Sequence, residues 1–334
     1  MSSTPRRRWL GLLLQLLGSG LAIGLLLQHA DLQQLRDALA IVDPFWLVLV
    51  IPIKALGVTL HELRLYQVLR AWGKPSLTRV LGIGYTSGLT NTVLPLRGGD
   101  VLAVALLRAE CKVSTVAAMT AVGVASVLEA LVFGVVLLLL LLFQGATWAS
   151  GVAELELSTL LRDVGLVIAV ATMGILAFVV VLRQIHHRAT RDDIPEQGLL
   201  QRLADAGRGL GLRAMAINTL LAVVQVGFFL GSMLVMFRAM GLDVVPALLA
   251  ACVLQAAGSL AATVLPQTMG AGQAASSVLV MATFGIGTAT ALALAALMWA
   301  SHQVVTVLLG GVPLWRRLGK LAQLRRDQGS VHTG

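Results

Sequence analysis

Candidate site residues are found among the ionisable side chains inside the long apolar segments of this 334-residue chain. They are Lys54, His61, Glu62 and Arg64 in one segment, Glu129 in a second, and His302, with the polar Gln303 beside it, in a third. On insertion scales a central Lys, Arg or Asp costs about 2.5–3.5 kcal/mol in a membrane helix. Such side chains are expected to face a cavity or one another, where they could bind a polar ligand or, in the case of Glu129, relay protons.

Arg97 lies at a break rich in proline and glycine, Leu94-Pro95-Leu96-Arg97-Gly98-Gly99-Asp100. A helix that begins at Gly98-Gly99 directs its free N–H groups and its positive dipole end toward Arg97. A fixed cation beside open N–H groups suits a phosphate or a carboxylate. Asp100 and the upstream Asn91 are further candidates for the same site.

The residues at this break also have a structural interpretation. Arg97 would then pair with Glu129 or Asp100, and Asp100 would cap the helix. Asn91 would make a hydrogen bond between helices.

The ionisable residues of the apolar segments have structural alternatives as well. Lys54 and His61 would form buried pairs with Glu62 or Glu129, and Glu129 would be the partner of an Arg. His302 would make a hydrogen bond between helices.

The composition of the chain indicates that it is a membrane protein. The chain is 57% hydrophobic and 12% charged, with a mean hydropathy of +0.86, whereas soluble domains carry about 25% charged residues. A membrane-spanning helix needs about 20 apolar residues. The segments of that kind are 9–28, 45–69, 114–143, 159–182, 213–237 and 286–312. We therefore expect an all-α, polytopic membrane bundle that forms a single integral membrane domain over residues 1–334.

The position of the 25 Lys and Arg residues indicates orientation, and the net charge of +9 is mostly a consequence of it. Most of them cluster in segments that the positive-inside rule assigns to the cytoplasm, including Arg6 to Arg8 and a basic tail over 313–334. The loops 29–44 and 144–158 hold acidic residues and at most one Arg, which is typical of external loops. Both termini are therefore expected in the cytoplasm of a multi-pass protein of the cell (inner) membrane.

This orientation requires segments 76–112 and 247–283 each to enter and leave the membrane on the same side. Each is broken in its middle by Pro and Gly. The breaks lie at Pro95 in the first segment and at Pro266, Gly270 and Gly272 in the second. Two half-length helices around a break are typical of a re-entrant hairpin, which is tolerated where it is buried in protein or lines a wet cavity. The alternative is two thin crossings apiece, which preserves the orientation.

The two breaks belong to an internal repeat. Thr92-Val93-Leu94-Pro95 recurs as Thr263-Val264-Leu265-Pro266, and at the same spacing Pro75 matches Pro246. Each half has the order span, span, hairpin, span, and the halves cover residues 9–143 and 159–312. An inverted repeat whose broken helices meet near the midplane is typical of alternating-access transporters. The alternative is that Pro and Gly merely kink two ordinary helices.

Other patterns point to no catalytic chemistry. No nucleophile–base pair, nucleotide-binding loop or metal-ligand cluster stands at usable spacing, so we expect no enzymatic activity, no cofactor and no metal. Orientation accounts for the basic residues, and we expect no nucleic-acid partner. Gly84-x-x-x-Gly88 permits close approach of helices.

The stretch Asn91 to Asp100 resembles the N-x-x-L-P-x-x-x-G-[DE] signature of the lysylphosphatidylglycerol synthase transmembrane region, a flippase-like family of bacterial and archaeal membrane proteins. Leu265-Pro266 with Gly270 and Gly272 resembles the second signature of that family, L-P-x-x-P-G-G-x-G. The resemblance covers the chain from about Lys54 to Gly311. It implies a membrane domain that moves an anionic or aminoacylated phospholipid, or another lipid-linked molecule, between leaflets.

The sequence departs from the pattern of this family at three places. Glu129 is followed by Ala130 where the family often has an acidic-basic pair, and Met269 replaces a proline of the second signature. His302-Gln303 stands where a Tyr-Arg pair is common. The sequence lacks the aminoacyl-transferring domain of the fused synthases, so the resemblance implies no lipid-modifying chemistry.

Three functional hypotheses follow. In the first, a lipid flippase, the head group enters a polar cavity formed by both hairpins, Arg97 neutralises its phosphate, and the tails stay in the bilayer. The second is a secondary transporter of a small anionic solute. The third is a non-transporting membrane subunit that scaffolds a partner lipid-modifying enzyme. A groove open to lipid between the hairpins favours the first, and a sealed vestibule favours the second.

Overall fold

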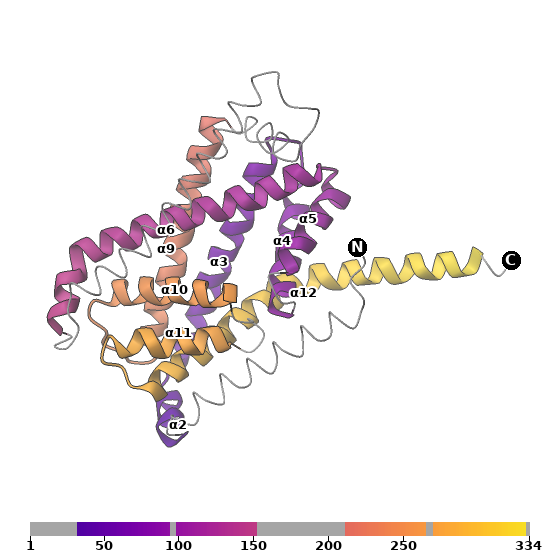
Figure 1. The fold of residues 1–334 in the computed structure, drawn as a ribbon. Helices are drawn as coiled ribbons and strands as arrows, with labels where there is room; N and C mark the ends of the chain where they lie inside the picture. Colours follow the sequence, from indigo (N-terminus) through magenta and orange to yellow (C-terminus); the bar gives the residue numbers. More distant parts are fainter. Residues whose placement is uncertain (1–31, 94–97, 152–210, 265–269, 332–334) are drawn as a thin grey trace.

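The computed structural model describes residues 32–93, 98–151, 211–264 and 270–331. Within these ranges every regular element is a helix, which confirms the all-α membrane class (Figure 1). Helices long and apolar enough to cross a membrane are Pro44–Leu69, Thr115–Gln144, Arg213–Ala239 and Thr288–Gly319. They correspond to four of the predicted spans, and the other two, 9–28 and 159–182, lie outside the described residues.

The described helices fall into two halves of the same design. Along the chain they are α2 (Leu32–Ala40), α3 (Pro44–Leu69), α4 (Leu77–Val93), α5 (Gly98–Cys111), α6 (Thr115–Gly151), α9 (Leu212–Ala239), α10 (Ala247–Val264), α11 (Ala271–Ala282) and α12 (Thr288–Val331). In each half a long helix is followed by two shorter helices and then by a second long helix. The order is α3, α4, α5, α6 in the first half and α9, α10, α11, α12 in the second.

The first half begins at a strong helix start. Asp43 is the N-cap of α3 and its Oδ1 accepts a hydrogen bond of 2.9 Å from the backbone N–H of Phe45. Pro44 occupies the first helical turn, where its missing N–H costs nothing. The apolar segment predicted to begin at residue 45 therefore begins one residue earlier as a helix.

Helical structure extends into both loops that the charges assign to the outside. Residues 29–44 contain α2, whose Leu35 and Ala38 pack on the main apolar core. The helix α6 continues past the predicted end at residue 143 to Gly151. A helix does not have to end at the membrane surface, and no proline interrupts residues 144–151.

The two predicted hairpins consist of paired short helices, α4 with α5 and α10 with α11. The 14-residue α5 and the 12-residue α11 are the shortest of them. At about 1.5 Å per residue they measure roughly 21 and 18 Å, less than the ~30 Å of the hydrocarbon core. Each half therefore has two short, paired helices where a hairpin was predicted, and residues 94–97 and 265–269 between them lie outside the described residues. The choice between re-entrant hairpins and thin crossings stays a prediction.

The equivalent long helices of the two halves run in opposite directions. The backbone N–H of Asp43, just before α3, donates to the carbonyl of Ala239 at the end of α9, over 2.7 Å. Near the other end, Arg64 of α3 is bonded to Asn218 in the first turns of α9. The equivalent helices α3 and α9 are thus antiparallel, as expected of an inverted repeat.

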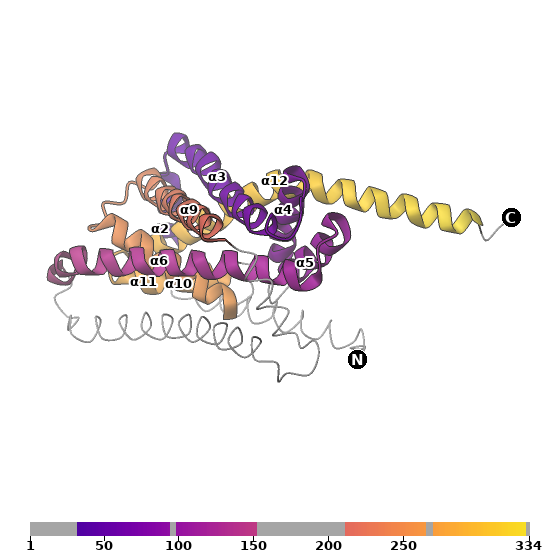
Figure 2. The ribbon, with the colours of Figure 1, turned by 90° about the horizontal axis from the view of Figure 1, so that it is seen from above.

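Contacts between the other helices follow the same relationship. The hairpin helix α4 packs against α12, and its equivalent α10 packs against α6. Likewise α5 contacts α6 while α11 contacts α12, and α6 contacts α9 while α12 contacts α3. Seen from above, the C-terminal part of α12 projects away from this bundle (Figure 2).

Candidate functional site

The long helix α3 carries four of the predicted site residues, Lys54, His61, Glu62 and Arg64. Lys54 and His61 are about 10 Å apart along the axis, because each residue advances the helix by about 1.5 Å. Two polar regions result. One surrounds Arg64 and faces α6 and α9, and the other surrounds Lys54 and faces α10, α11 and α12.

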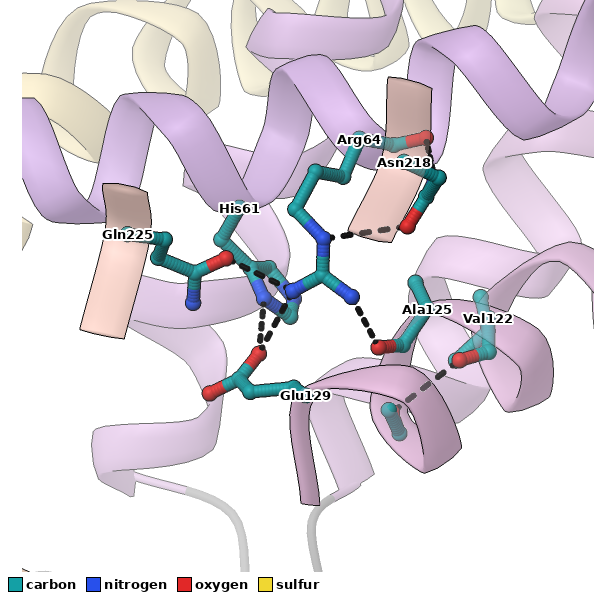
Figure 3. A network of polar contacts seen from close by, with 8 residues as sticks. His61, Arg64, Val122, Ala125, Glu129, Asn218 and Gln225 are labelled. Atoms are coloured by element: carbon teal, nitrogen blue, oxygen red, sulfur yellow. Dashed lines mark hydrogen bonds and ion pairs between the residues drawn. The ribbon is translucent and has the colours of Figure 1, made fainter. Parts of the chain in front are cut away.

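Arg64 is fully buried at the centre of the first region (Figure 3). Its Nε donates to Asn218 Oδ1 over 3.1 Å, and its Nη1 donates to Gln225 Oε1 over 2.7 Å and to Glu129 Oε2 over 3.2 Å. Its Nη2 donates to the carbonyl of Ala125 over 2.5 Å. A guanidinium has five N–H donors, so most of them are already bound by protein. Arg64 therefore joins α3, α6 and α9.

Glu129 binds a second partner through the same oxygen. His61 Nδ1 lies 2.9 Å from Glu129 Oε2, and the two side chains are 32% and 29% exposed. Of the alternatives that the sequence leaves open for these residues, the structure contains the His61–Glu129 pair together with an Arg partner for Glu129. This pair is the partly open end of the Arg64 network, because Arg64 itself is 0% exposed.

Asn91 joins the two helices of the first hairpin. Its Oδ1 accepts from the backbone N–H of Gly99 over 2.7 Å, and its Nδ2 donates to Asp100 Oδ1 over 2.8 Å. This close approach needs a glycine, because a Cβ at position 99 would overlap the carbonyl oxygen of Ser87. Asn91 therefore caps the start of α5, where Gly98 is the first residue, and positions Asp100.

The second region encloses a cavity of about 200 Å³. It lies among α3, α9, α10, α11 and α12, and its polar lining comes from Lys54, Ser232, Gln255, Ser259, Gln273, His302 and Gln303. Three of the predicted site residues, Lys54, His302 and Gln303, are thus brought together here. Gly270 and Gly272, predicted to mark the second break, line the same cavity.

Lys54 is held by neutral groups. Its Nζ donates to the carbonyl of Met298 over 3.0 Å and to Ser301 Oγ over 2.8 Å. No Asp or Glu is found among the described residues that line the cavity. Within the described part of the chain, Lys54 is therefore not in the buried Lys–Glu pair that was one alternative, and its positive charge has no acidic partner there.

The start of α11 adds donors to this cavity. Gly270 precedes the helix with φ of 67°, a left-handed conformation that favours glycine, and no side chain caps it. The first N–H groups of α11 and its positive dipole end lie at this point. Trp299 packs so closely here that a Cβ at Gly270 would come within 3.0 Å of its ring. The indole N–H of Trp299 is buried with no partner among the described residues.

Several sequence predictions lie outside the described residues, namely Pro95, Arg97 and Pro266. Sequence reasoning missed the neutral partners of Arg64 and Lys54. Asn218 and Gln225 were the detectable ones, since they are the two amides of a mostly apolar helix and their seven-residue spacing places them on one face. Ser301 and Trp299 carry no comparable signal.

The described residues include no group of three or more His, Cys, Asp or Glu side chains that could hold a metal ion. What they form is a cationic cavity and, across α3, a separate cluster of ionisable groups. This arrangement suits binding of an anionic group within the membrane.

Comparisons with known proteins gave one family. The family model described as "Lysylphosphatidylglycerol synthase TM region" matches residues 11–310. The match begins earlier in the chain than Lys54, where the resemblance was expected to begin. No curated protein and no solved structure gave a significant match.

Proposed function

The chain belongs to the lysylphosphatidylglycerol synthase TM region family, and from this premise and the geometry of the cavity we propose that it is a flippase-like lipid transporter. Its substrate would be an anionic or aminoacylated phospholipid, or a lipid-linked molecule. The head group would enter the cavity beside Lys54 while the acyl chains stay in the bilayer. The inverted arrangement of the two halves supports alternating access to this cavity from the two leaflets.

The observation that carries the proposal is the ammonium group of Lys54, which lies in a cavity within the apolar bundle and has no acidic partner among the described residues. An ammonium has three donors, and the protein uses two of them on neutral oxygens. A cation at this depth costs several kcal/mol when it has no counter-charge. A phosphate or carboxylate head group supplies both the counter-charge and the missing acceptor.

The uncapped start of α11 favours the same ligand. Backbone N–H groups at a helix N-terminus bind anions, and the helix dipole adds to the attraction. Here they face the cavity that holds Lys54, and the unpartnered indole N–H of Trp299 is a further donor. The sequence also predicts an anion site at Arg97, and this prediction belongs to the same hypothesis.

The experiment is lipid movement in proteoliposomes. Purified protein is reconstituted with a fluorescent anionic phospholipid, and the loss of protected fluorescence after addition of a membrane-impermeant quencher reports movement between leaflets. We expect Lys54→Gln to slow movement at least tenfold, because one charge-assisted contact to the head group is lost. The matched control is Lys74→Gln, at an exposed lysine outside the cavity.

Unchanged movement in Lys54→Gln, with thermal stability like that of the wild type, would remove this cavity from the pathway. Uptake of a small anionic solute without lipid movement would favour the solute transporter instead. The sequence prediction is tested in the same assay, in which Arg97→Ala is expected to abolish movement without lowering expression.

A further inference from the structure

Glu62 is the most deeply buried acidic side chain among the described residues, with 7% of its surface exposed. It lies in α3, two turns before the end of the helix at Leu69. Its Oε2 has no hydrogen-bond partner in the described part of the chain. An ionised carboxylate buried in this way costs several kcal/mol unless it is paired. Packing alone does not explain why an acidic residue stands here.

The first hairpin is shaped around this carboxylate. Gly84 of α4 faces it, and a Cβ at position 84 would overlap the carboxyl group of Glu62. One turn further along α4, a Cβ at Gly88 would meet no atom within 4 Å. The space at Gly84 is therefore left open specifically for Glu62.

The ionisable groups that interact electrostatically with Glu62 come from four helices. They are His61 on α3, Tyr85 on α4, Asp100 on α5 and Glu129 on α6. Arg64, two residues away, directs its donors to Asn218, Gln225, Glu129 and Ala125 (Figure 3). From α9 the network receives only the neutral amides of Asn218 and Gln225.

This cluster carries excess negative charge when both of its glutamates are ionised. Glu62 and Glu129 are two potential anions, and Arg64, which is bonded to Glu129, is the permanent cation. A proton on Glu62 removes the excess negative charge, and its uptake needs only a carboxyl oxygen without a hydrogen-bond partner. Mg²⁺ or Ca²⁺ takes about six or more oxygen ligands, far more than the two carboxyl oxygens of Glu62 supply.

We propose that Glu62 is a reversible proton-binding site and that proton binding there is coupled to the transport cycle. The coupling rests on the proposed lipid transport, whereas the binding site does not. In the binding step a proton from water forms an O–H bond on the Glu62 carboxylate, and the reverse step returns it. His61 and Glu129, each about a third exposed, connect the cluster to its surroundings.

Position explains how the proton would act on the fold. Glu62 lies on α3, and Asp100 lies on the first hairpin. When both are ionised they repel each other, which favours separation of the hairpin from α3. A proton on Glu62 removes this repulsion and favours the packed arrangement at Gly84. The proton thus biases an equilibrium between two positions of the hairpin, as coupling between sites requires.

The first test is lipid accumulation driven by a pH gradient in proteoliposomes. If one proton moves per lipid, each unit of pH changes the steady-state ratio of fluorescent lipid between leaflets about tenfold, because one pH unit is tenfold in proton activity. Glu62→Gln, which is permanently neutral, is expected to lose this response and to keep a ratio near one. The control Asp243→Asn, at an exposed acidic residue, is expected to respond like the wild type.

The second test does not depend on transport. Infrared difference spectroscopy of the protein in bilayers, between acidic and alkaline buffer, detects the carbonyl stretch of a protonated carboxyl group. One such band from a buried group is expected in the wild type and in Asp243→Asn, and it should be absent in Glu62→Gln. If Glu62→Gln does not fold, Glu62→Asp serves instead, in which the band should persist at a shifted frequency.

The outcomes separate the two proposals. Lipid movement that is independent of the pH gradient in the wild type would overturn the coupling, but it would still support the flippase function. A Glu62 band without any lipid movement would support the proton site and overturn the flippase function. Absence of a Glu62 band across the titration would overturn the proton site.

Discussion

The guanidinium of Arg317 on α12 holds both carboxylate oxygens of Glu110 on α5. Its Nε lies 2.8 Å from Oε1 and its Nη2 lies 3.1 Å from Oε2. Its Nη1 continues to α4, where it donates to the carbonyl of Gly82 over 2.8 Å and to Thr86 Oγ1 over 2.7 Å. One side chain of the second half therefore fastens both helices of the first hairpin. Two parallel charge-assisted bonds of this kind are strong and directional.

Loss of this contact should loosen the first hairpin. We expect Arg317→Ala to lower the free energy of unfolding by about 1.5–3 kcal/mol, the range for hydrogen bonds to charged groups. Cys111, next to Glu110 in the sequence, should then react faster with a maleimide, and Cys252 is too buried to contribute. The matched control is Arg316→Ala at the exposed neighbouring residue. Equal labelling rates in the two variants would contradict a role for this contact.

Removal of Arg64 should be more costly than removal of any exposed arginine. Arg64→Met leaves Glu129, Asn218 and Gln225 without their shared donor, and breaking a buried pair on one side costs about 3–5 kcal/mol. Thermal unfolding in detergent measures the effect, with Arg70→Met at the exposed end of α3 as the control. A double-mutant cycle with Glu129→Gln should give a coupling energy of about 0.5–3 kcal/mol. A cycle with no coupling would show that the two residues act independently.

The existence of this network was only partly predictable from the sequence. The depth of Arg64 and Glu129 in apolar segments indicated that each needs a partner, because unpaired charges are costly there. Which partners they have depends on how α9 lies against α3. Amides such as Asn218 and Gln225 give no charge signal, so the sequence offered only their spacing. In the same way the sequence indicated Lys54 and His302 separately, and only the packing of α3 against α12 shows that they share a cavity.

Glycine spacing was a less selective guide than charge. Gly84-x-x-x-Gly88 predicted close packing of helices at both residues. Only Gly84 has no room for a Cβ, and the neighbour that fills the space is the side chain of Glu62 instead of a helix backbone. The tight contact between α4 and α12 is made by Gly310, whose neighbour Gly311 has open space. A pattern of small residues shows that close approach is permitted, whereas the partner helix decides where it occurs.

This contrast gives a direct prediction for the α4–α12 contact. A Cβ at Gly310 would come within 2.5 Å of the backbone carbonyl oxygen of Tyr85 and within 2.9 Å of Leu89 Cβ. Gly310→Ala must therefore push the two helices apart, and overpacking of this kind costs about 1–3 kcal/mol. Gly311→Ala should instead be neutral or stabilising by a few tenths of a kcal/mol, because alanine favours a helix over glycine by up to about 1 kcal/mol. Similar melting temperatures for the two variants would contradict the close contact.

The antiparallel packing of α3 and α9 leads to a prediction about which side of the membrane each loop lies on. If the halves are inverted and each hairpin enters and leaves on one side, the segments that follow the two hairpins lie on opposite sides. Ser114, between α5 and α6, and Gly287, between α11 and α12, are exposed and mark these points.

In a background with Cys111→Ser and Cys252→Ala, a single cysteine at position 114 should be protected from an impermeant maleimide added outside intact cells. A cysteine at position 287 should react with it, because the charge distribution assigns the first hairpin to the cytoplasmic side and the second to the outside. Labelling of both positions from the same side would refute the inverted arrangement of the hairpins, even though α3 and α9 would remain antiparallel.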